Sequence, residues 1–124
     1  MTKRRILLVD DEVSITSALA RYLTEFGGCE VRVENEGSRA LEAALAFHPD
    51  LIFLDILMPD TDGGTVAAEI DADPILNGTP VVFLTALVSP RELRGGTRIG
   101  GYPFLAKPVH PDTVLAAIAE HARS

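Results

Sequence analysis

Five short apolar runs, separated by segments with helical periodicity, constrain the fold more than any other feature of the sequence. Each run is rich in branched or aromatic side chains and is bounded by polar or turn-forming residues, which is typical of β-strands. The runs are RILLV at 5–9, CEVRV at 29–33, LIFL at 51–54, PVVFL at 80–84 and PFLA at 103–106. Four of them lack apolar–polar alternation, which indicates strands covered on both faces, whereas residues 29–33 alternate and are expected nearer an edge.

Helical patterns lie between these runs and after the last one. Their apolar positions are Ile15, Leu19, Tyr22 and Phe26, then Leu41, Ala44 and Leu45, then Val66, Ala67 and Ile70, and finally Val114, Leu115 and Ile118. Gly27-Gly28 is expected to end the first helix, and Pro111 to begin the last. Alternating strands and helices with short connections predict an α/β protein with one domain, residues 1–124, and a doubly wound parallel sheet.

The segment between the fourth and fifth runs has the weakest helical pattern. Ser89 is a good N-cap, Pro90 suits the first turn, and Glu92 completes a capping box. Gly95 and Gly96 follow, and each costs about 1 kcal/mol relative to alanine inside a helix. We therefore expect a short or frayed helix here.

Composition restricts the environment and the partners. No apolar run approaches the roughly 20 residues that span a bilayer, and the run behind the basic start is too short for a secretory signal, so a cytoplasmic location is expected. The single Cys29 cannot form an intrachain disulfide and is expected to be a small buried hydrophobe. A net charge of −7 with scattered basic residues argues against direct binding of nucleic acid.

Polar residues follow the ends of four of the five expected strands in a pattern that suits a phosphoryl site. Ligands of open parallel sheets bind at the carboxyl ends of the strands. The residues at these ends are Asp10, Asp11 and Glu12, then Asp55, then Thr85, and finally Lys107-Pro108. The remaining strand ends in Glu34 and Asn35, which are expected to lie away from the centre. The carboxylates, the hydroxyl and the amine are thus expected to converge on one crevice.

Each of these residues also has a structural interpretation when taken alone. Asp10 or Asp11 could cap the first helix, and Asp55 could be a loop residue before the turn MPDTDGG. Thr85 could be a loop or capping hydroxyl, and Lys107 a solvated lysine. Their joint occurrence at strand ends favours a shared site.

Clustered carboxylates need protons or a cation. Two carboxylates about 4 Å apart repel by roughly 4 kcal/mol at an effective dielectric constant near 20. Mg²⁺ prefers oxygen ligands and is commonly bound by one or two carboxylates with phosphate oxygens. A zinc site is not expected, because His48, His110 and His121 share no ligand spacing and are expected at the surface.

Beside a metal ion, Asp55 could attack phosphorus and carry the phosphoryl group as a covalent intermediate. Lys107 would neutralise charge on the equatorial oxygens, and the Thr85 hydroxyl could donate to the same oxygens.

Taken together, these motifs resemble the receiver domain of two-component response regulators over essentially the whole chain. The matching elements are Asp10-Asp11 in LLVDDE, Asp55 in LIFLDILMPDTDG, Thr85 in VVFLTA and Lys107 in PFLAKP. The resemblance implies a flavodoxin-like sheet in the order 2-1-3-4-5. It also implies Mg²⁺ held by Asp11, Asp55 and the main-chain carbonyl of Leu57, with Asp10 assisting through water.

The resemblance further implies the partners and the output of the site. Asp55 would accept its phosphoryl group from a histidine kinase or a histidine phosphotransfer protein, and a downstream output domain or protein would respond. The protein would catalyse only its own phosphorylation and dephosphorylation. Thr85 would move toward the phosphoryl group and Phe104 would swing inward behind it, although Phe104 could also be a core aromatic. The Lys107-Pro108 bond is expected to be cis.

Three features depart from the usual receiver pattern. Leu57 and Leu87 occupy positions where many receivers carry polar side chains, so they are expected to hinder the attacking water and lengthen the life of the phosphoryl group. Phe104 lacks a hydroxyl, so any signal it carries is steric. The glycine-rich LRGGTRIGGYP replaces what is usually a regular helix, and we expect residues 94–101 to open locally at low free energy.

Two other functions remain as alternatives. A haloacid-dehalogenase-like phosphatase would need a second Asp two residues after the nucleophile, where this chain has Leu57. A receiver-like interaction module that acts independently of phosphorylation would not need the full set of site residues.

Overall fold

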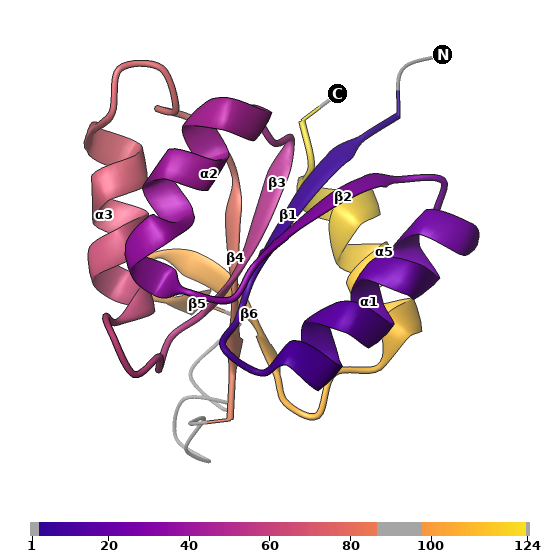
Figure 1. The fold of residues 1–124 in the computed structure, drawn as a ribbon. Helices are drawn as coiled ribbons and strands as arrows, with labels where there is room; N and C mark the ends of the chain where they lie inside the picture. Colours follow the sequence, from indigo (N-terminus) through magenta and orange to yellow (C-terminus); the bar gives the residue numbers. More distant parts are fainter. Residues whose placement is uncertain (1–2, 87–97, 124) are drawn as a thin grey trace.

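The computed structural model describes residues 3–86 and 98–123, which form a central sheet with helices on both faces (Figure 1). The strands are β1 Arg5–Val9, β2 Glu30–Glu34, β3 Leu51–Asp55, β4 Val81–Thr85, β5 Arg98–Ile99 and β6 Tyr102–Ala106. The helices are α1 Val13–Glu25, the 3₁₀ helix η1 Gly37–Arg39, α2 Ala40–Phe47, α3 Gly63–Ala72 and α5 Pro111–His121. The five expected strands are therefore present. The expected short helix at Ser89–Glu92 lies outside the described residues.

The strand order is β2-β1-β3-β4-β6-β5. The pairs from β2 to β6 are all parallel, so the expected order 2-1-3-4-5 is confirmed with β6 as the fifth long strand. The short β5 adds one antiparallel pairing outside β6. Gly100 and Gly101 form the turn between them with φ values of 58° and 89°, a region that glycine adopts at little cost.

Each face of the sheet has its own apolar core. Successive strand residues point to opposite faces, so Leu7 and Val9 pack under α2 and α3, whereas Ile6 and Leu8 pack under α1 and α5 (Figure 1). Strands β1, β3 and β4 are covered on both sides, which explains their continuous apolar sequence. This packing leaves the strand ends as the places where polar side chains can gather.

Helix α1 buries a different stripe from the one that its sequence suggests. Its buried residues are Thr16, Leu19 and Leu23, whereas Phe26 is 71 % exposed. Phe26 is the C-cap and keeps a helical conformation, with its N–H donating to Tyr22 O, so it lies with Tyr22 beside the buried stripe and not within it. The Phe26 and Tyr22 rings contact each other in a tilted arrangement, with centroids 5.0 Å apart.

Four further structural expectations can be compared with the fold. Cys29 is buried, with 4 % of its surface exposed. His48 and His110 are exposed, while His121 is only partly so. Proline begins α5 as expected. No helix within residues 3–86 and 98–123 is long and apolar enough to cross a membrane.

Candidate functional site

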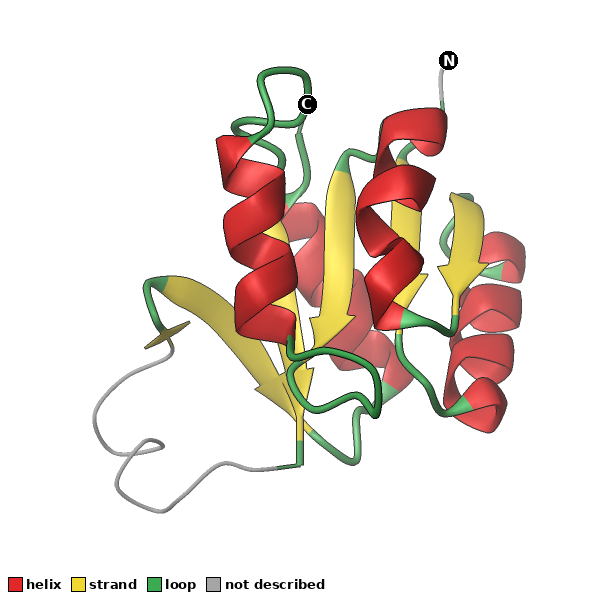
Figure 2. Cartoon of the chain, turned by 60° about the vertical axis from the view of Figure 1, so that its left-hand side comes forward, coloured by secondary structure: helices red, strands yellow, loops and turns green. Residues whose placement is uncertain are grey.

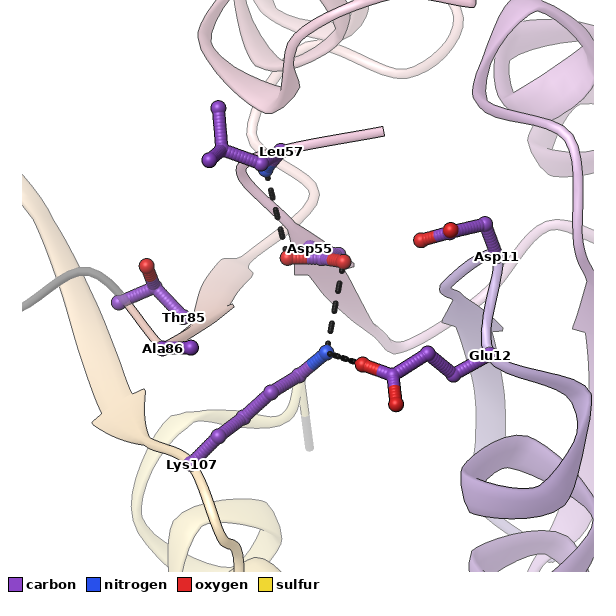
Figure 3. Close-up of a pocket in the computed structure, with 7 residues that line it drawn as sticks. All are labelled: Asp11, Glu12, Asp55, Leu57, Thr85, Ala86 and Lys107. Atoms are coloured by element: carbon purple, nitrogen blue, oxygen red, sulfur yellow. Dashed lines mark hydrogen bonds and ion pairs between the residues drawn. The ribbon is translucent and has the colours of Figure 1, made fainter. Parts of the chain in front are cut away.

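The carboxyl ends of β1, β3, β4 and β6 meet at one end of the sheet (Figure 2). Asp55 and Thr85 are the last residues of β3 and β4, one residue later than the expected strand ends. Asp55 pairs in register with Leu84, and Thr85 pairs with Ala106, so the ends of neighbouring strands lie side by side. The pocket at this end is lined by Asp11, Glu12, Asp55, Leu57, Thr85, Ala86 and Lys107 (Figure 3). The expected convergence of carboxylates, hydroxyl and amine on one crevice is therefore what the fold produces.

Lys107 is the cation of this pocket and contacts three carboxylates. Its Nζ atom lies 2.7 Å from Asp10 Oδ2, 3.0 Å from Glu12 Oε1 and 3.4 Å from Asp55 Oδ2. Only 9 % of its side chain is exposed, so the interpretation of Lys107 as a solvated lysine is wrong. Its main-chain N–H donates to Thr85 O at 2.8 Å, and this bond fixes the end of β6 against β4. The following Lys107-Pro108 bond is cis, as expected.

Asp10 lies beneath the pocket and is fully buried. Its Oδ1 atom accepts a hydrogen bond from the Glu12 N–H at 2.9 Å, so it supports the loop between β1 and α1. Its Oδ2 atom forms an ion pair with the Lys107 ammonium, 2.7 Å away. Burying the Asp10 carboxylate without such a cation would be costly.

Neither Asp10 nor Asp11 caps α1 with its side chain. The N-cap residue is Glu12, and its own side chain makes no capping bond. The Glu12 carboxylate reaches Lys107 instead. The acidic run thus serves the pocket rather than the helix end.

Asp10, Asp11 and Asp55 form a cluster that suits a metal ion. One carboxylate oxygen from each lies within 4.8 Å of the others. Asp11 is exposed to the pocket, whereas Asp10 and Asp55 are buried. Hard divalent cations prefer such all-oxygen donor sets, and one lysine cannot balance three aspartates. Apart from its ion pair with Lys107, Asp10 Oδ2 has no partner among the described residues, which adds to the fit between this cluster and a cation.

The environment of Asp55 disfavours its charged form. Burial raises its pKa, and the nearby charge of Asp10 raises it further. Lys107 and the Leu57 N–H, which donates to Asp55 Oδ1 at 3.3 Å, act in the opposite direction. The net pKa is about 6, well above the ordinary value for aspartate. A divalent cation at this cluster would favour the ionised form that a nucleophile needs.

Opposing effects act on the pKa of Lys107. Burial lowers it, but hydrogen bonds to Asp10 and Glu12 and the charges of Asp10 and Asp55 raise it by more, so the net shift is upward. Lys107 therefore stays an ammonium ion across the physiological range.

A close backbone approach at Gly63 fixes the position of Asp55. A Cβ atom at residue 63 would lie 2.5 Å from the main-chain oxygen of Asp55 and 2.9 Å from the Cα atom of Ile56. The Gly63 N–H donates to Ile56 O at 2.7 Å, and Asp62 caps α3 by accepting from the Thr65 N–H. The turn MPDTDGG thus folds back against the end of β3 and holds it.

The other expected site residues occupy different depths. Thr85 is 1 % exposed at the end of β4, and Leu57 is 55 % exposed at the pocket rim. Phe104 is half-buried on β6 and packs against the core under α2 and α3. Leu87 lies outside the described residues.

Two contacts of this site were not predicted from the sequence. Glu12 binds Lys107, and the Asn35 side chain donates to the main-chain oxygen of Asp10 at 2.7 Å. Asn35 does not line the pocket, but its contact with the Asp10 main chain was not foreseen when it was expected to lie away from the centre. Because β2 is the direct neighbour of β1, the residue after β2 lies beside the residue after β1. The expected strand order, which places β2 beside β1, could therefore have predicted the contact between Asn35 and Asp10.

Comparisons with known proteins agree with the geometry. A family model described as the response regulator receiver domain matches residues 6–119. Response regulator PleD of Caulobacter vibrioides is 35 % identical over 120 residues, which cover 96 % of this chain and 26 % of PleD. DNA-binding response regulator MtrA of Mycolicibacterium smegmatis is 32 % identical over 121 residues, covering 98 % of this chain and 51 % of MtrA.

Among solved structures, chemotaxis protein CheY4 of Vibrio cholerae matches with a TM-score of 0.83 and 28 % identity, covering 97 % of this chain and 99 % of that chain. The chain thus spans nearly all of CheY4 but about half of MtrA and about a quarter of PleD.

Proposed function

The chain belongs to the response regulator receiver domain family, and we propose that Asp55 is the residue that accepts its phosphoryl group. A member of this family is a phosphoacceptor signalling module rather than a conventional enzyme. One observation carries the assignment to Asp55. Its carboxylate lies in the pocket 3.4 Å from the Lys107 ammonium, and Asp11 and Thr85 line the same pocket.

The transfer requires an in-line exchange at phosphorus. An Asp55 oxygen would form a bond to phosphorus while the phosphorus–nitrogen bond of a phosphohistidine breaks, and the imidazole would leave with the bonding pair and take up a proton. Lys107 would move its contacts from carboxylate oxygens to phosphoryl oxygens. The Thr85 hydroxyl would donate to the same oxygens.

The acidic cluster supports the choice of Mg²⁺ as the cofactor. Asp11, Asp55 and the main-chain carbonyl of Leu57 would hold the ion, with Asp10 acting through water. When bound, a divalent cation supplies positive charge that stabilises the equatorial oxygens of the transferred group. Mg²⁺ suits this role because it retains water and accepts phosphate oxygens as ligands.

Thr85 and Phe104 are the proposed switch. Thr85 lies in the pocket wall, and Phe104 sits two positions before Ala106, which pairs with Thr85 across the β4–β6 ladder. Movement of Thr85 toward a phosphoryl group would leave space that the Phe104 ring could enter. Phe104 carries no hydroxyl, so this signal would be a change of packing.

Membership of the receiver family indicates the class of partner. A receiver domain implies a kinase partner, and we propose a histidine kinase or histidine phosphotransfer protein as donor and a downstream domain or protein as the responder. We further propose that residues 1–124 act as one receiver domain in the cytoplasm, without binding nucleic acid directly. The scattered basic residues and the net charge of −7 support this last point.

Acetyl phosphate provides the test. Incubation with Mg²⁺ should add one phosphoryl mass to the intact protein, whereas Asp55→Asn or removal of Mg²⁺ should prevent the addition. Continuous turnover of many equivalents would instead support a phosphatase, and equal labelling of Asp55→Asn would refute the assignment. No adduct, with unchanged partner binding, would support the phosphorylation-independent module.

A further inference from the structure

We propose that Asn35 is a positioning residue of the cation site, acting through the main chain of Asp10. The Asn35 Nδ2 atom lies 2.7 Å from the main-chain oxygen of Asp10 and 3.0 Å from the Thr16 Oγ1 atom. One amide therefore joins the strand end that carries the acidic pair to the first turn of α1. The inference rests on the proposed metal site, and it adds a residue that touches neither the ion nor the phosphoryl group.

The orientation of the Asn35 amide follows from its partners. The Asp10 carbonyl can only accept, and Thr16 Oγ1 donates its own hydrogen to Val13 O at 3.1 Å. Both partners therefore need a donor from residue 35, and the two hydrogens of an amide nitrogen supply them. Thr16 is 1 % exposed, so its oxygen depends on a protein partner.

The Asp10 carbonyl is a sensitive point for the acidic pair. It belongs to the peptide group that joins Asp10 to Asp11, so its direction sets how the Asp11 side chain leaves the backbone. Asp11 is exposed, and side-chain packing does little to orient it. Asp10 also receives backbone support on its other side, where its N–H donates to Glu34 O at 3.1 Å. Glu34 and Asn35, at the end of β2, thus bind both the N–H and the carbonyl of Asp10.

The single charge of Lys107 offsets only part of the repulsion among the clustered carboxylates, so without a metal ion this repulsion favours relaxation of the turn away from the clustered geometry. A hydrogen bond that holds the peptide group resists this relaxation and lowers the cost of ordering the site when the ion binds. Asn35 would thus raise cation affinity by preorganisation, without contributing charge.

Asn77 offers a matched control. Its Nδ2 atom donates to the main-chain oxygen of Asp71 at 2.7 Å, so Asn77→Ala also removes a bond from an amide side chain to a carbonyl. This bond lies at the end of α3, among residues that do not line the pocket. Asn77 is exposed whereas Asn35 is partly buried, so the free energy of unfolding of both variants should be measured beside their Mg²⁺ affinity. Loss of positioning should lower the Mg²⁺ affinity of the folded protein only in the residue 35 variant.

The experiment is calorimetric titration of Mg²⁺ into wild type, Asn35→Ala and Asn77→Ala. We expect the dissociation constant to rise about tenfold in Asn35→Ala, the lower end for residues that orient metal ligands, and to stay within about twofold in Asn77→Ala. Asn35→Leu keeps the side-chain volume but lacks the two donor hydrogens, so its dissociation constant should equal that of Asn35→Ala. It replaces the alanine variant if that variant folds poorly. Equal constants for the Asn35 variants and wild type would overturn the proposal.

A second measurement needs no metal. In metal-free protein, the Asp10 and Glu12 amides should exchange with solvent about three- to tenfold faster in Asn35→Ala than in Asn77→Ala. If wild type binds no Mg²⁺, the proposed metal site and this inference both fail. If wild type binds Mg²⁺ and the Asn35 variants differ from it in neither affinity nor exchange, only this inference fails.

Discussion

The Lys107 ammonium lies 2.7 Å from Asp10 Oδ2, closer than to any other carboxylate of the pocket. Asp10 is fully buried, so this ion pair is the most deeply buried contact of the site. Asp55 and Glu12 also contact the Lys107 ammonium. Asp55, the proposed phosphoacceptor, thus has a cation within reach in the metal-free protein. In the proposed transfer, Lys107 would exchange some of its contacts with carboxylate oxygens for contacts with phosphoryl oxygens.

Lys107→Ala should destabilise the metal-free protein and make its stability depend on Mg²⁺. Removing one partner of a buried ion pair leaves carboxylates uncompensated, which costs about 3 kcal/mol in the free energy of unfolding. Mg²⁺ should restore part of this loss, because it supplies the missing positive charge. Urea denaturation with and without Mg²⁺ measures both effects. Lys3, the other lysine of the chain, provides the control variant Lys3→Ala, and equal stability of the two variants would contradict the role of Lys107.

Asp55→Asn should stabilise the metal-free protein at neutral pH. The pKa of Asp55 is raised to about 6 in the folded state, so between about pH 4 and pH 6 the native protein binds more protons than the unfolded chain. Stability from this group is present below pH 4 and is lost as pH rises through 6. The asparagine variant escapes this loss and should gain on the order of 2 kcal/mol at pH 7.5, with little difference from wild type at pH 4.

Asp60→Asn is the control for this pH dependence. The pKa of Asp60 is lowered by hydrogen bonds from Ser38, including its N–H at 2.8 Å, so its charged form is favoured in the folded state. Its removal should not stabilise the protein at pH 7.5. Denaturation curves at pH 4, 6 and 7.5 compare the variants, and an Asp55→Asn protein that is less stable than wild type at pH 7.5 would contradict the raised pKa.

Leu57→Asn should shorten the life of the phosphorylated protein. Leu57 is 55 % exposed at the rim of the pocket, where its side chain can shield the phosphoryl group but cannot orient water. An amide would assist the attacking water, so loss of the adduct in chelator should become severalfold faster. Leu57→Met keeps an apolar side chain and should leave the rate near that of wild type. Unchanged or slower loss in Leu57→Asn would count against the shielding role.

Gly63→Ala should weaken both the fold and the site, because a new Cβ atom would meet the Asp55 and Ile56 backbone, which cannot yield easily. We expect a loss of about 2 kcal/mol in the free energy of unfolding and slower phosphorylation. Gly64→Ala is the neighbouring control, since its Cβ atom would meet only the Asp62 side chain, at 3.1 Å. Similar stability for the two alanine variants would show that Gly63 is not required for close approach.

The sequence was most informative where the physical signal is local. Runs such as LIFL read as buried strands because both faces are covered, and the residue after each strand follows from chain order alone. The convergence of Asp55 and Lys107 could be predicted because parallel strands carry their carboxyl ends to the same edge.

Contacts that depend on side-chain reach were harder to predict. Asn35 follows the edge strand β2, and its proposed role depends on the hydrogen bond from its side-chain amide to the main-chain oxygen of Asp10, after β1. Phe26 lies outside the buried stripe of α1 because the helix turns Thr16, Leu19 and Leu23 toward the sheet, and apolar periodicity alone did not show that the polar Thr16 belongs to this stripe. The pairing of β5 with β6 involves two residues and a glycine turn, too short to leave a strand pattern.

Chemical mapping of the modified residue tests the assignment of Asp55 most directly. Borohydride reduces an aspartyl phosphate to homoserine, with release of phosphate, so the protein should be treated with acetyl phosphate and Mg²⁺, reduced, digested and sequenced by mass spectrometry. We expect homoserine at position 55 and unmodified aspartate at positions 10 and 11. Homoserine at either of those positions, with intact Asp55, would contradict the assignment.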